Sequence, residues 1–498
     1  MIRLFSNRFR QKVRLKAVIL VMGILFLFAT TGWNLYQALL WDAPVNISFT
    51  STESLAPTLA ADSTGTLHVI WAEDSQLNGR SGNSLIYSSL SQGLWSNPID
   101  IVYTSGEISS SPSMDVDEQD ILHLVWLGGF SDRLVYSQVV AVNAGSAKNW
   151  SSPTIISPIT NLVGQPDLAV GNDGTLQVIY PVLAGELSGI YYISSLDNGI
   201  SWSSPNYAYL NDVSGRMVTN SRMAVDENGG IHAVWTETPY PETFPPIGIR
   251  YTHSFDGGLT WSRPRNIDGP YDMADILAIG ENEVHVVWSG TLENRHKFHF
   301  FSSDRGDTWS APVVTIDTGG YQGRPGLAAD SQNTVHLVQV SNAPGTILES
   351  LFHQSFQNQR WSLPERLVER DANAPFHPID PNITVGLGNQ IHVAVPVSIQ
   401  NRSGGWAYDI LYFHAESSAP PIEPEAQVPA ATPTAEGSEA ETAPAATSSP
   451  AAAPTNLSPV SGSEDMQEVG SNPLWIGIVP VVVLIVVVFV FQQSRRKQ

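Results

Sequence analysis

The chain contains no cysteine among its 498 residues. This absence excludes disulfide bonds, thiolate metal sites and a lipid-anchored cysteine. Whatever fold the chain adopts must therefore be stabilised by its packed core and its hydrogen bonds alone.

Lysine is scarce away from the two ends of the chain. The basic tips, MIRLFSNRFRQKVRLK and SRRKQ, hold nine of the 25 Lys and Arg residues, which leaves sixteen basic residues against 47 acidic ones for the rest. Between the tips only Lys148 and Lys297 are lysines. Because such an acidic surface repels phosphate backbones, these numbers exclude a nucleic-acid partner.

Long apolar runs occur only near the ends. Residues 1–33 join a basic tip to the run AVILVMGILFLFA, which predicts a cleaved signal peptide or an uncleaved signal anchor. Residues 474–491 are close to the ~20 residues that span a bilayer and predict a transmembrane helix, followed by a basic cytoplasmic tail at 492–498. The positive-inside rule then puts the middle of the chain outside a cell membrane, anchored at one end or at both.

Residues 417–472 have almost no aromatic or large apolar side chains. Their composition of Ala, Pro, Ser, Thr and Glu cannot bury enough apolar surface to fold. We therefore predict an extended, disordered and acidic stalk next to the transmembrane helix.

Helical periodicity is absent from residues 38–416, where short β-branched and aromatic segments alternate with turn residues. One apolar strand, usually with His in second place, returns at intervals of 51 to 56 residues as LHVIW, LHLVW, LQVIY, IHAVW, VHVVW, VHLVQ and IHVAV. A second marker, Trp-Ser-x-Pro, follows six of these strands. Four short strands in each unit of this length are typical of a β-propeller blade.

The seventh unit has no Trp-Ser-x-Pro after its third strand. The segment LWDAPVNIS, around Trp41, carries that fourth-strand pattern and precedes the first unit. We therefore predict an all-β, seven-bladed β-propeller in which the N-terminal strand completes the last blade and leaves no open sheet edge.

The strand histidines resemble a set of metal ligands, but they occupy equivalent places in different units and would lie around a ring rather than in one cluster. We interpret them as core residues that form hydrogen bonds, and we expect no metal and no cofactor. They are His68, His123, His232, His285, His336 and His392.

An octamer with Ser, Asp, Gly and Trp at positions one, three, five and eight occurs as SLDNGISW (195–202), SFDGGLTW (254–261) and SSDRGDTW (302–309). It falls between the third and fourth strands, where Asp can accept amide hydrogen bonds, Gly can adopt a positive φ and Trp can pack back onto the blade. The predicted structural residues are Ser195, Asp197, Gly199, Trp202, Ser254, Asp256, Gly258, Trp261, Ser302, Asp304, Gly306 and Trp309.

These octamers resemble the Asp-box, or BNR repeat, of the sialidase superfamily, and the resemblance runs along residues 41–416. It implies a propeller, for which the six blades of sialidases are the alternative to seven. It also implies a Tyr nucleophile with a Glu partner, an Asp acid/base and three arginines that bind the sugar carboxylate. The first of these arginines is replaced here by the stretch Leu55-Ala56-Pro57, whereas Arg222 and Arg324 stand at the starts of inner strands. We therefore expect a non-catalytic or divergent member.

The connections between the second and third strands share the face on which propellers usually bind, and they are longer here than the octamer turns. Candidate ligand-binding residues by position are Glu73, Asp74, Glu237, Tyr240, Glu242, Glu293, Arg295 and Trp406.

Two classes of function remain open. The first is a membrane-tethered recognition or scaffold module for glycan or envelope-protein ligands, which the missing arginine favours. The alternative is an exo-acting glycoside hydrolase of the sialidase type.

Overall fold

A computed structural model describes residues 39–420 except 51, 78–79, 105–106, 131, 158–162, 184–186, 292–294, 317–318, 321–322, 376 and 401–403. The predicted signal or anchor segment, the stalk beyond residue 420, the transmembrane helix and the basic tail lie outside the described residues. No helix among the described residues is long and apolar enough to cross a membrane.

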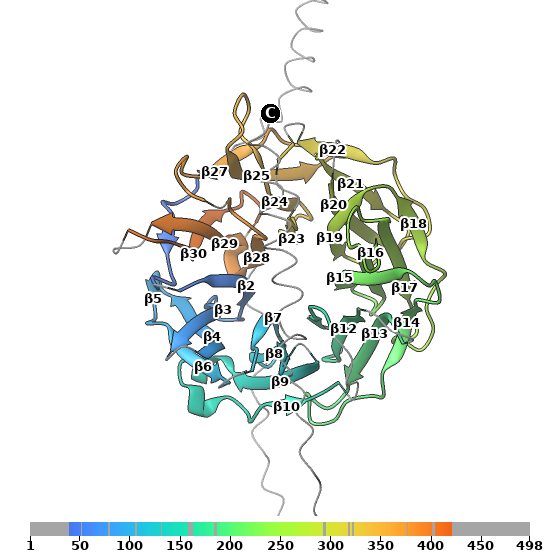
Figure 1. Ribbon diagram of the computed structural model, residues 1–498, viewed down its shortest axis with the longest axis horizontal. Helices are drawn as coiled ribbons and strands as arrows, with labels where there is room; N and C mark the ends of the chain where they lie inside the picture. The colour runs from blue at the N-terminus through green and yellow to red at the C-terminus, as the bar shows by residue number, and fades with distance from the viewer. Residues whose placement is uncertain are drawn as a thin grey trace, which may run out of the picture. The chain divides into compact units, whose positions relative to one another are not determined.

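The described residues form seven antiparallel sheets, which are arranged as the blades of a ring (Figure 1). In blades 1 and 6 the fourth strand is interrupted and is counted as two. Blade 1 contains β2 (Ser54–Ala61), β3 (Leu67–Leu77), β4 (Arg80–Ser91), β5 (Leu94–Trp95) and β6 (Ile99–Tyr103). Blade 2 contains β7 (Ser110–Val116), β8 (Ile121–Gly128), β9 (Arg133–Val140) and β10 (Thr154–Ile155), and blade 3 contains β11 (Asp167–Val170), β12 (Leu176–Val182), β13 (Gly189–Ser195) and β14 (Asn206–Leu210).

Blade 4 contains β15 (Arg216–Val225), β16 (Ile231–Pro239), β17 (Gly248–Ser254) and β18 (Arg265–Asp268), and blade 5 contains β19 (Tyr271–Ile279), β20 (Glu283–Gly290), β21 (Lys297–Ser302) and β22 (Val313–Ile316). Blade 6 contains β23 (Gly326–Ala329), β24 (Val335–Asn342), β25 (Glu349–Gln357), β26 (Arg360–Trp361) and β27 (Glu365–Glu369). Blade 7 contains β28 (Asn382–Gly386), β29 (Gln390–Gln400), β30 (Trp406–Glu416) and β1 (Val45–Asn46). Three short 3-10 helices complete the set: η1 (Ala141–Asn143), η2 (Ala147–Asn149) and η3 (Leu387–Asn389).

The N-terminal strand closes the ring as predicted. Strand β1 pairs antiparallel with β30, with Val45 opposite Tyr412. The architecture is thus a seven-bladed β-propeller, and the six-bladed alternative is wrong because the first segment adds its strand to a seventh sheet instead of to a sixth.

The recurring apolar strands form the core because neighbouring blades cover both of their faces. The tryptophans at their ends, Trp71, Trp126, Trp235 and Trp288, are almost fully buried. Core clusters extend from one blade to the next, as where Trp71 of blade 1 shares a cluster with Tyr412 of blade 7. Burial of these strands on both sides is the main stabilising contribution in a fold without disulfides.

A repeated aromatic contact joins each blade to the one before it. The Trp of each fourth strand lies edge-on against a third-strand Tyr or His of the preceding blade, with ring centroids 4.8–6.2 Å apart. That Tyr or His is in turn hydrogen-bonded to the second-strand His, or in blade 3 to Gln177. The pairs are Trp95–Tyr412, Trp150–Tyr87, Trp202–Tyr136, Trp261–Tyr192, Trp309–Tyr251, Trp361–His299 and Trp41–His353.

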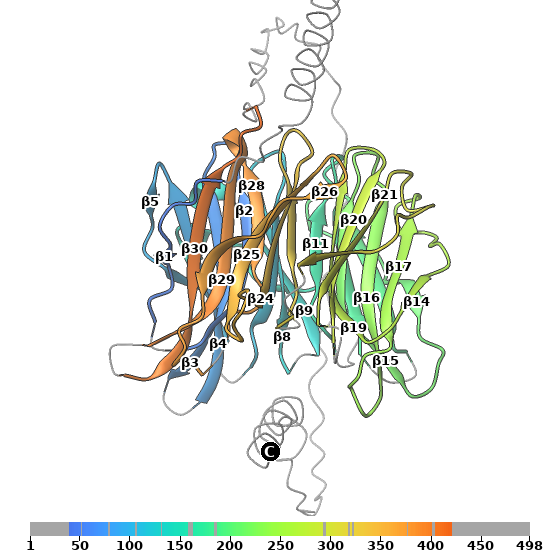
Figure 2. The same cartoon turned by 90° about the horizontal axis from the view of Figure 1, so that it is seen from above.

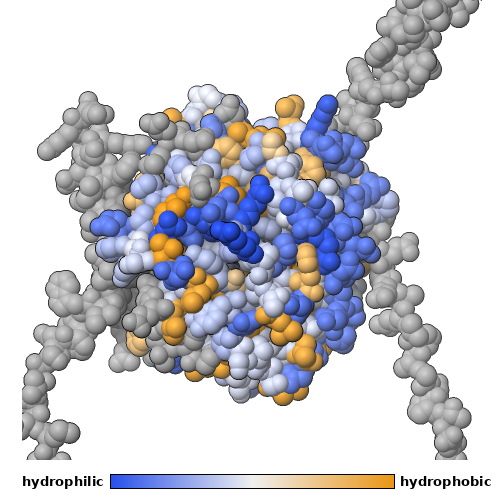
Figure 3. All heavy atoms as spheres, turned by 90° about the vertical axis from the view of Figure 1, so that its right-hand side faces the viewer, coloured by the Kyte–Doolittle hydropathy of each residue, from blue (hydrophilic) through white to orange (hydrophobic). Residues whose placement is uncertain are grey.

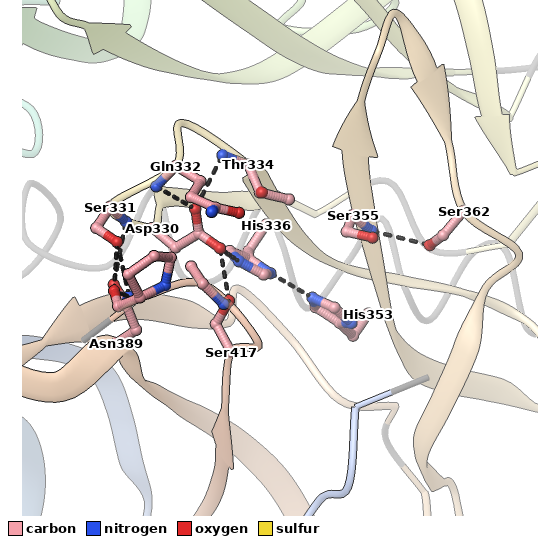
Figure 4. A network of polar contacts seen from close by, with 12 residues as sticks. Asp330, Ser331, Gln332, Thr334, His336, His353, Ser355, Ser362, Asn389 and Ser417 are labelled. Atoms are coloured by element: carbon pink, nitrogen blue, oxygen red, sulfur yellow. Dashed lines mark hydrogen bonds and ion pairs between the residues drawn. The ribbon is translucent and has the colours of Figure 1, made fainter. Parts of the chain in front are cut away.

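The strand histidines are core residues, as the sequence predicted. In blade 6, His336 lies between Asp330 and His353 (Figure 4). Burial lowers the pKa of His353 to about 4 and the pKa of His392 to about 3. His353 and His392 are therefore neutral at physiological pH. The strand histidines act as hydrogen-bonding links inside their blades.

The octamers form the turns between third and fourth strands. In the second octamer the backbone amide of Thr260 donates to Asp256 Oδ1 at 2.9 Å. Hydrogen bonds, the first of them from the Thr260 side chain, lower the pKa of Asp256 to about 2. Gly258 has φ +80°, and a Cβ there would lie 2.3 Å from Tyr192 Cε1 of the preceding blade. The glycine is thus required by its backbone conformation and also by the contact between blades.

The propeller has two faces, which are named here by their connections. The octamer face carries the turns between third and fourth strands. Strands β5 and β26, which directly follow two of these turns, lie toward the top of Figure 2. The loop face carries the connections between second and third strands and those that lead into the next blade; the hairpins β3–β4 and β29–β30 reach it at the bottom of Figure 2. On the outer side near β18, apolar residues form separate groups among hydrophilic ones (Figure 3).

Candidate functional site

The inner strands share a distinctive irregularity near the loop face. Register shifts interrupt the pairing of the first and second strands in blades 1, 2, 4 and 5. The residue at the centre of this irregularity can be compared in all seven blades, because it is described in each. In five of them it is a residue other than Gly with φ between 37° and 54°. Those residues are Ala56, Ser111, Asn220, Met273 and Asp380; Gln165 and Arg324 hold the same position in blades 3 and 6 without a positive φ. Strained backbone of this kind is often found at functional sites.

Arg222 lies two residues further along the inner strand of blade 4, between carboxylates of its two neighbours. Its Nη1 is 3.2 Å from Asp167 Oδ1 and its Nε is 4.0 Å from Asp275 Oδ1. Each carboxylate also accepts a hydrogen bond from a backbone amide of the next blade. The Met223 amide donates to Asp167 at 2.8 Å, and the Leu327 amide donates to Asp275 at 2.9 Å. The Arg222 side chain is 19% exposed, so it is held in place while remaining accessible to solvent.

Asp275 differs from an ordinary surface carboxylate. Burial raises its pKa to about 6, although the charge of Arg222 acts in the opposite direction. A carboxyl group with this pKa can hold or release a proton near neutral pH.

Arg324, at the start of the blade 6 inner strand, crosses toward blade 3. Its Nη1 donates to Gln165 Oε1 at 3.1 Å, and its backbone amide donates to Asp380 Oδ1 at 2.8 Å. Within the described residues, Nε and Nη2 of Arg324 have no hydrogen-bond acceptor. Burial, together with the charge of Arg222, lowers the pKa of this guanidinium to about 10. Arg324 is therefore a buried cation with only part of its donor capacity used.

Lys297 supports the segment that carries Arg324. It is 1% exposed, and its Nζ donates to Ser289 Oγ at 2.6 Å and to the Gly323 carbonyl at 2.9 Å. Burial lowers the pKa of its ammonium group to about 7. Its contact with Gly323 fixes the backbone immediately before Arg324.

A second charged cluster lies at the blade 3–blade 4 boundary around Glu237. Its Oε2 is 2.9 Å from Arg216 Nη1 and 2.8 Å from Arg250 Nη2, and its Oε1 accepts from the Tyr209 hydroxyl at 3.0 Å. This is a Tyr–Glu pair, but burial raises the pKa of Tyr209 to about 12. The phenol is therefore held in its protonated, weakly nucleophilic form.

Four candidates that the sequence placed in loops lie in strands instead: Glu73, Asp74, Glu237 and Trp406. Two of them, Glu73 and Glu237, are buried there. Glu73 belongs to β3 and is buried, with Ser54 Oγ at 2.8 Å and Trp71 Nε1 at 3.1 Å donating to its carboxylate. Glu237 belongs to β16 and is buried as described above. The loop interpretation was wrong for both because the second strands extend further than the turn residues after them indicate.

The other predicted candidates are dispersed. Tyr240 and Glu242 are exposed on the β16–β17 connection, Arg295 is exposed before β21, and Trp406 is half-buried at the first residue of β30. Asp74 is in β3, but its side chain lies outside the described part, as does all of Glu293. Among the predicted residues whose side chains the structure describes, Arg222 and Arg324 are the two brought to the centre of the ring.

Sequence reasoning missed Asp167, Asp275, Gln165 and Lys297. One usable signal was present: Asp167, Arg222 and Asp275 occupy the same register position of successive units, each opposite the fourth residue of the recurring apolar strand. Charged residues at an inner-strand position in three consecutive units indicate a cluster once the ring closes.

The loop face also carries exposed aromatic side chains, which occur where fourth strands end or where second and third strands connect. They are Phe49, Tyr103, Phe130, Tyr240 and Phe244. Exposed aromatics are enriched where proteins bind ligands because they offer a flat apolar face. Among the described residues, no group of three or more His, Asp or Glu is arranged to hold a metal ion.

Comparisons with solved structures show a likeness of fold. An ulvan lyase, described as a new family of polysaccharide lyase PL25 and bound to -[GlcA(1-4)Rha3S]-, has a TM-score of 0.51 and 10% identity, covering 74% of this chain and 95% of its own. A protein of unknown function from Dyadobacter fermentans has a TM-score of 0.48 and 11% identity over 76% and 99% of the two chains. The NanB sialidase from Streptococcus pneumoniae has a TM-score of 0.41 and 13% identity over 77% and 71%. No family model and no curated protein sequence matches the chain.

Proposed function

We propose that this chain is an extracytoplasmic, membrane-tethered propeller that recognises glycan or protein ligands with its loop face. It binds these ligands and does not cleave sialosides. The membrane tether consists of the C-terminal segment 474–491 and, if it is not cleaved, of residues 1–33 as well.

The position of Arg222 between two carboxylates supports the part of this proposal that excludes sialoside cleavage. A sugar carboxylate bound by three arginines needs cations that are free to pair with it. Here Arg222 already pairs with Asp167 and approaches Asp275. Arg324 is buried against Gln165, and Ala56 occupies the equivalent position in blade 1. The centre of the ring therefore favours neutral ligands that donate and accept hydrogen bonds over anionic ligands that need unpaired arginines.

The exposed aromatics support recognition. A pyranose ring has a face of C–H groups that packs on a flat aromatic side chain, and its hydroxyl groups pair with nearby charged residues. Tyr240 and Phe244 share the β16–β17 connection, and Phe130 lies on the corresponding connection of blade 2. Aromatic anchors of this kind contribute most of the binding free energy in many protein interfaces as well.

Glycan cleavage is the second candidate, and Asp275 is the observation that favours it. Its pKa of about 6 is suited to a general acid or base, and it lies beside Arg222. The ulvan lyase of similar fold acts on a polysaccharide. Cleavage of the sialidase type is less favoured because the Tyr209–Glu237 pair holds its phenol protonated.

Glycan-array binding by the soluble fragment 38–420, run beside a fluorogenic sialoside assay, tests both interpretations of the site. We expect binding to a defined set of ligands, loss of that binding in Phe130→Ala or Tyr240→Ala, and no sialoside turnover. Leu196→Ala on the octamer face is the control and should bind normally. Turnover that disappears in Arg222→Ala would refute the recognition proposal.

The membrane location has a separate test. Protease added to intact cells should digest the propeller, and N-terminal sequencing of the mature chain decides whether one anchor or two are present. A propeller that is protected on intact cells and digested only after lysis would refute the extracytoplasmic location.

A further inference from the structure

Both ends of the described chain leave the propeller on the octamer face. At the N-terminal end, the Leu39 amide and Trp41 Nε1 both donate to Glu365, and the Asp42 amide donates to the His414 carbonyl near the end of β30. Strand β30 itself ends at Glu416 on this face. The chain enters and leaves the propeller on the same side.

The C-terminal exit is fixed by side-chain contacts. Ser417, which the sequence assigned to the stalk, is buried, and its Oγ donates to Asp330 Oδ2 at 2.6 Å (Figure 4). Ser331 Oγ then donates to the Pro420 carbonyl at 2.6 Å. Both partners belong to the turn between the first and second strands of blade 6, which also lies on the octamer face. The segment that connects to residues 474–491 therefore starts from a defined point on this face.

The octamer face also exposes aliphatic side chains that the turns do not require. The side chains at positions two and six of the octamer include Leu196 and Ile200 in blade 3 and Leu259 in blade 4, and these aliphatic groups take no part in the hydrogen bonds of the turn. Among the described residues, six aliphatic residues at the turns and chain entry of this face are between 76% and 87% exposed: Leu40, Leu94, Val142, Leu196, Ile200 and Leu259. Leu363, 86% exposed, follows β26 in the fourth strand of blade 6. On the loop face, Ile347 is the aliphatic residue with comparable exposure within the described part of the chain.

We propose that the octamer face rests on the surface of the membrane to which the chain is tethered, with these aliphatic side chains in the interface of a zwitterionic bilayer. This inference rests on the proposed membrane tether. It deepens that proposal by assigning the face that meets the lipid. The loop face, with Arg222 and the exposed aromatics, is then directed away from the membrane and toward ligands.

Electrostatic attraction does not drive this contact. The octamer carboxylates of Asp197 and Asp256 accept hydrogen bonds within their own turns, and the chain has no basic cluster between its tips. A weak apolar contact is sufficient because the tether keeps the face at a high effective concentration near the bilayer. If residues 1–33 remain as an anchor, only residues 34–40 separate it from Trp41, where the chain enters the propeller on this face.

The absence of native cysteine allows a clean test on the full-length chain. Ile200→Cys and Ile347→Cys form a matched pair, because both isoleucines are 83% exposed and they lie on opposite faces. Each variant is labelled with the same fluorophore and reconstituted into phosphatidylcholine vesicles that contain a spin-labelled phosphatidylcholine as quencher. We expect several-fold stronger quenching at position 200 than at position 347.

Each contrary outcome has a distinct meaning. Equal quenching at the two positions, or stronger quenching at position 347, in chains that float with the vesicles would overturn the docking proposal and leave the tether intact. Chains that do not float with the vesicles would overturn the tether and the docking proposal together. Efficient energy transfer between two Ile200→Cys chains carrying donor and acceptor would identify a second copy as the occupant of this face and would also overturn the proposal.

Discussion

Gln165 and Arg324 lie on blades 3 and 6 and meet at the centre of the ring, where Arg324 Nη1 donates to Gln165 Oε1 at 3.1 Å. In the other five blades the equivalent residue has a positive φ. The two residues whose side chains join distant blades are thus the two with ordinary backbone at this position. A direct link between blades that are not neighbours ties the two sides of the ring together.

Removal of this link should weaken the propeller. Gln165→Ala deprives a buried guanidinium of its side-chain acceptor, and we expect the free energy of unfolding to fall by about 2 kcal/mol, as for hydrogen bonds to charged groups. Urea denaturation of Gln165→Ala, Arg324→Met and the double variant measures the coupling. Strictly additive losses would show that the two side chains do not interact in solution.

Lys297 should make stability depend on pH. Its pKa is about 7 in the folded state and about 10.5 in the unfolded chain. Between these values the unfolded state binds the proton that the folded state lacks, so this group makes stability rise with pH by about 1.4 kcal/mol per unit. Below pH 7 the whole penalty of the buried charge is present. Denaturation at pH 7, 8 and 9 should show this rise in the wild type and lose it in Lys297→Met.

Lys148 provides the control for that experiment. It is exposed on η2 and is the other lysine between the basic tips. Lys148→Met should keep the slope of the wild type. If Lys297→Met kept that slope as well, the buried ammonium would have to titrate near its ordinary pKa.

Two adjacent glycines of one octamer separate backbone strain from steric contact. Gly257 has φ +69°, and a Cβ added there would meet nothing within 4 Å, whereas a Cβ at Gly258 would overlap Tyr192. We expect Gly257→Ala to lower the free energy of unfolding by about 1 kcal/mol through its positive φ alone. Gly258→Ala should lose a further ~2 kcal/mol or more because the Tyr192 ring must move. Equal losses in thermal or urea unfolding would argue against the blade contact.

The closing strand should be needed for stability. Trp41→Ala removes an edge-on contact with His353 and the hydrogen bond from Nε1 to Glu365, for an expected loss of about 2–3 kcal/mol. Leu40→Ala next to it, 87% exposed, should change stability by less than ~0.5 kcal/mol. If the two variants unfolded at the same urea concentration, the first segment would not act as a clasp.

The fold could be predicted to the level of individual strands because its information is periodic and local. The spacing of the strand histidines determined the blades, and the missing Trp-Ser-x-Pro of the last unit indicated that β1 would pair with β30. The octamer glycines have the positive φ that the turn requires. Each of these features is expressed within one unit or in a comparison of units.

The candidate site could be predicted only in part, because its residues come together through contacts between different blades. Asp167 and Asp275 are each an ordinary polar residue in a short strand, and their meaning depends on Arg222 in the blade between them. Glu73 and Glu237 were assigned to loops because no local pattern indicates that Trp71 Nε1 or Arg250 will stabilise a carboxylate inside the extended strands. The burial of these two carboxylates and their hydrogen-bond partners depend on the tertiary structure, so they cannot be predicted from the local sequence.

The contact between Trp41 and His353 also constrains the order in which the propeller is made. Five of the seven Trp contacts of this kind join a blade to the one synthesised just before it. The two exceptions are Trp41 with His353 and Trp95 with Tyr412. These two contacts, and the pairing of β1 with β30, need residues from the last two blades. During synthesis the first segment to emerge therefore remains without its partner until the seventh blade is complete. Until then both the first and the latest blade present an uncovered side, and a factor that shields the N-terminal segment would protect the unfinished ring from pairing with another chain.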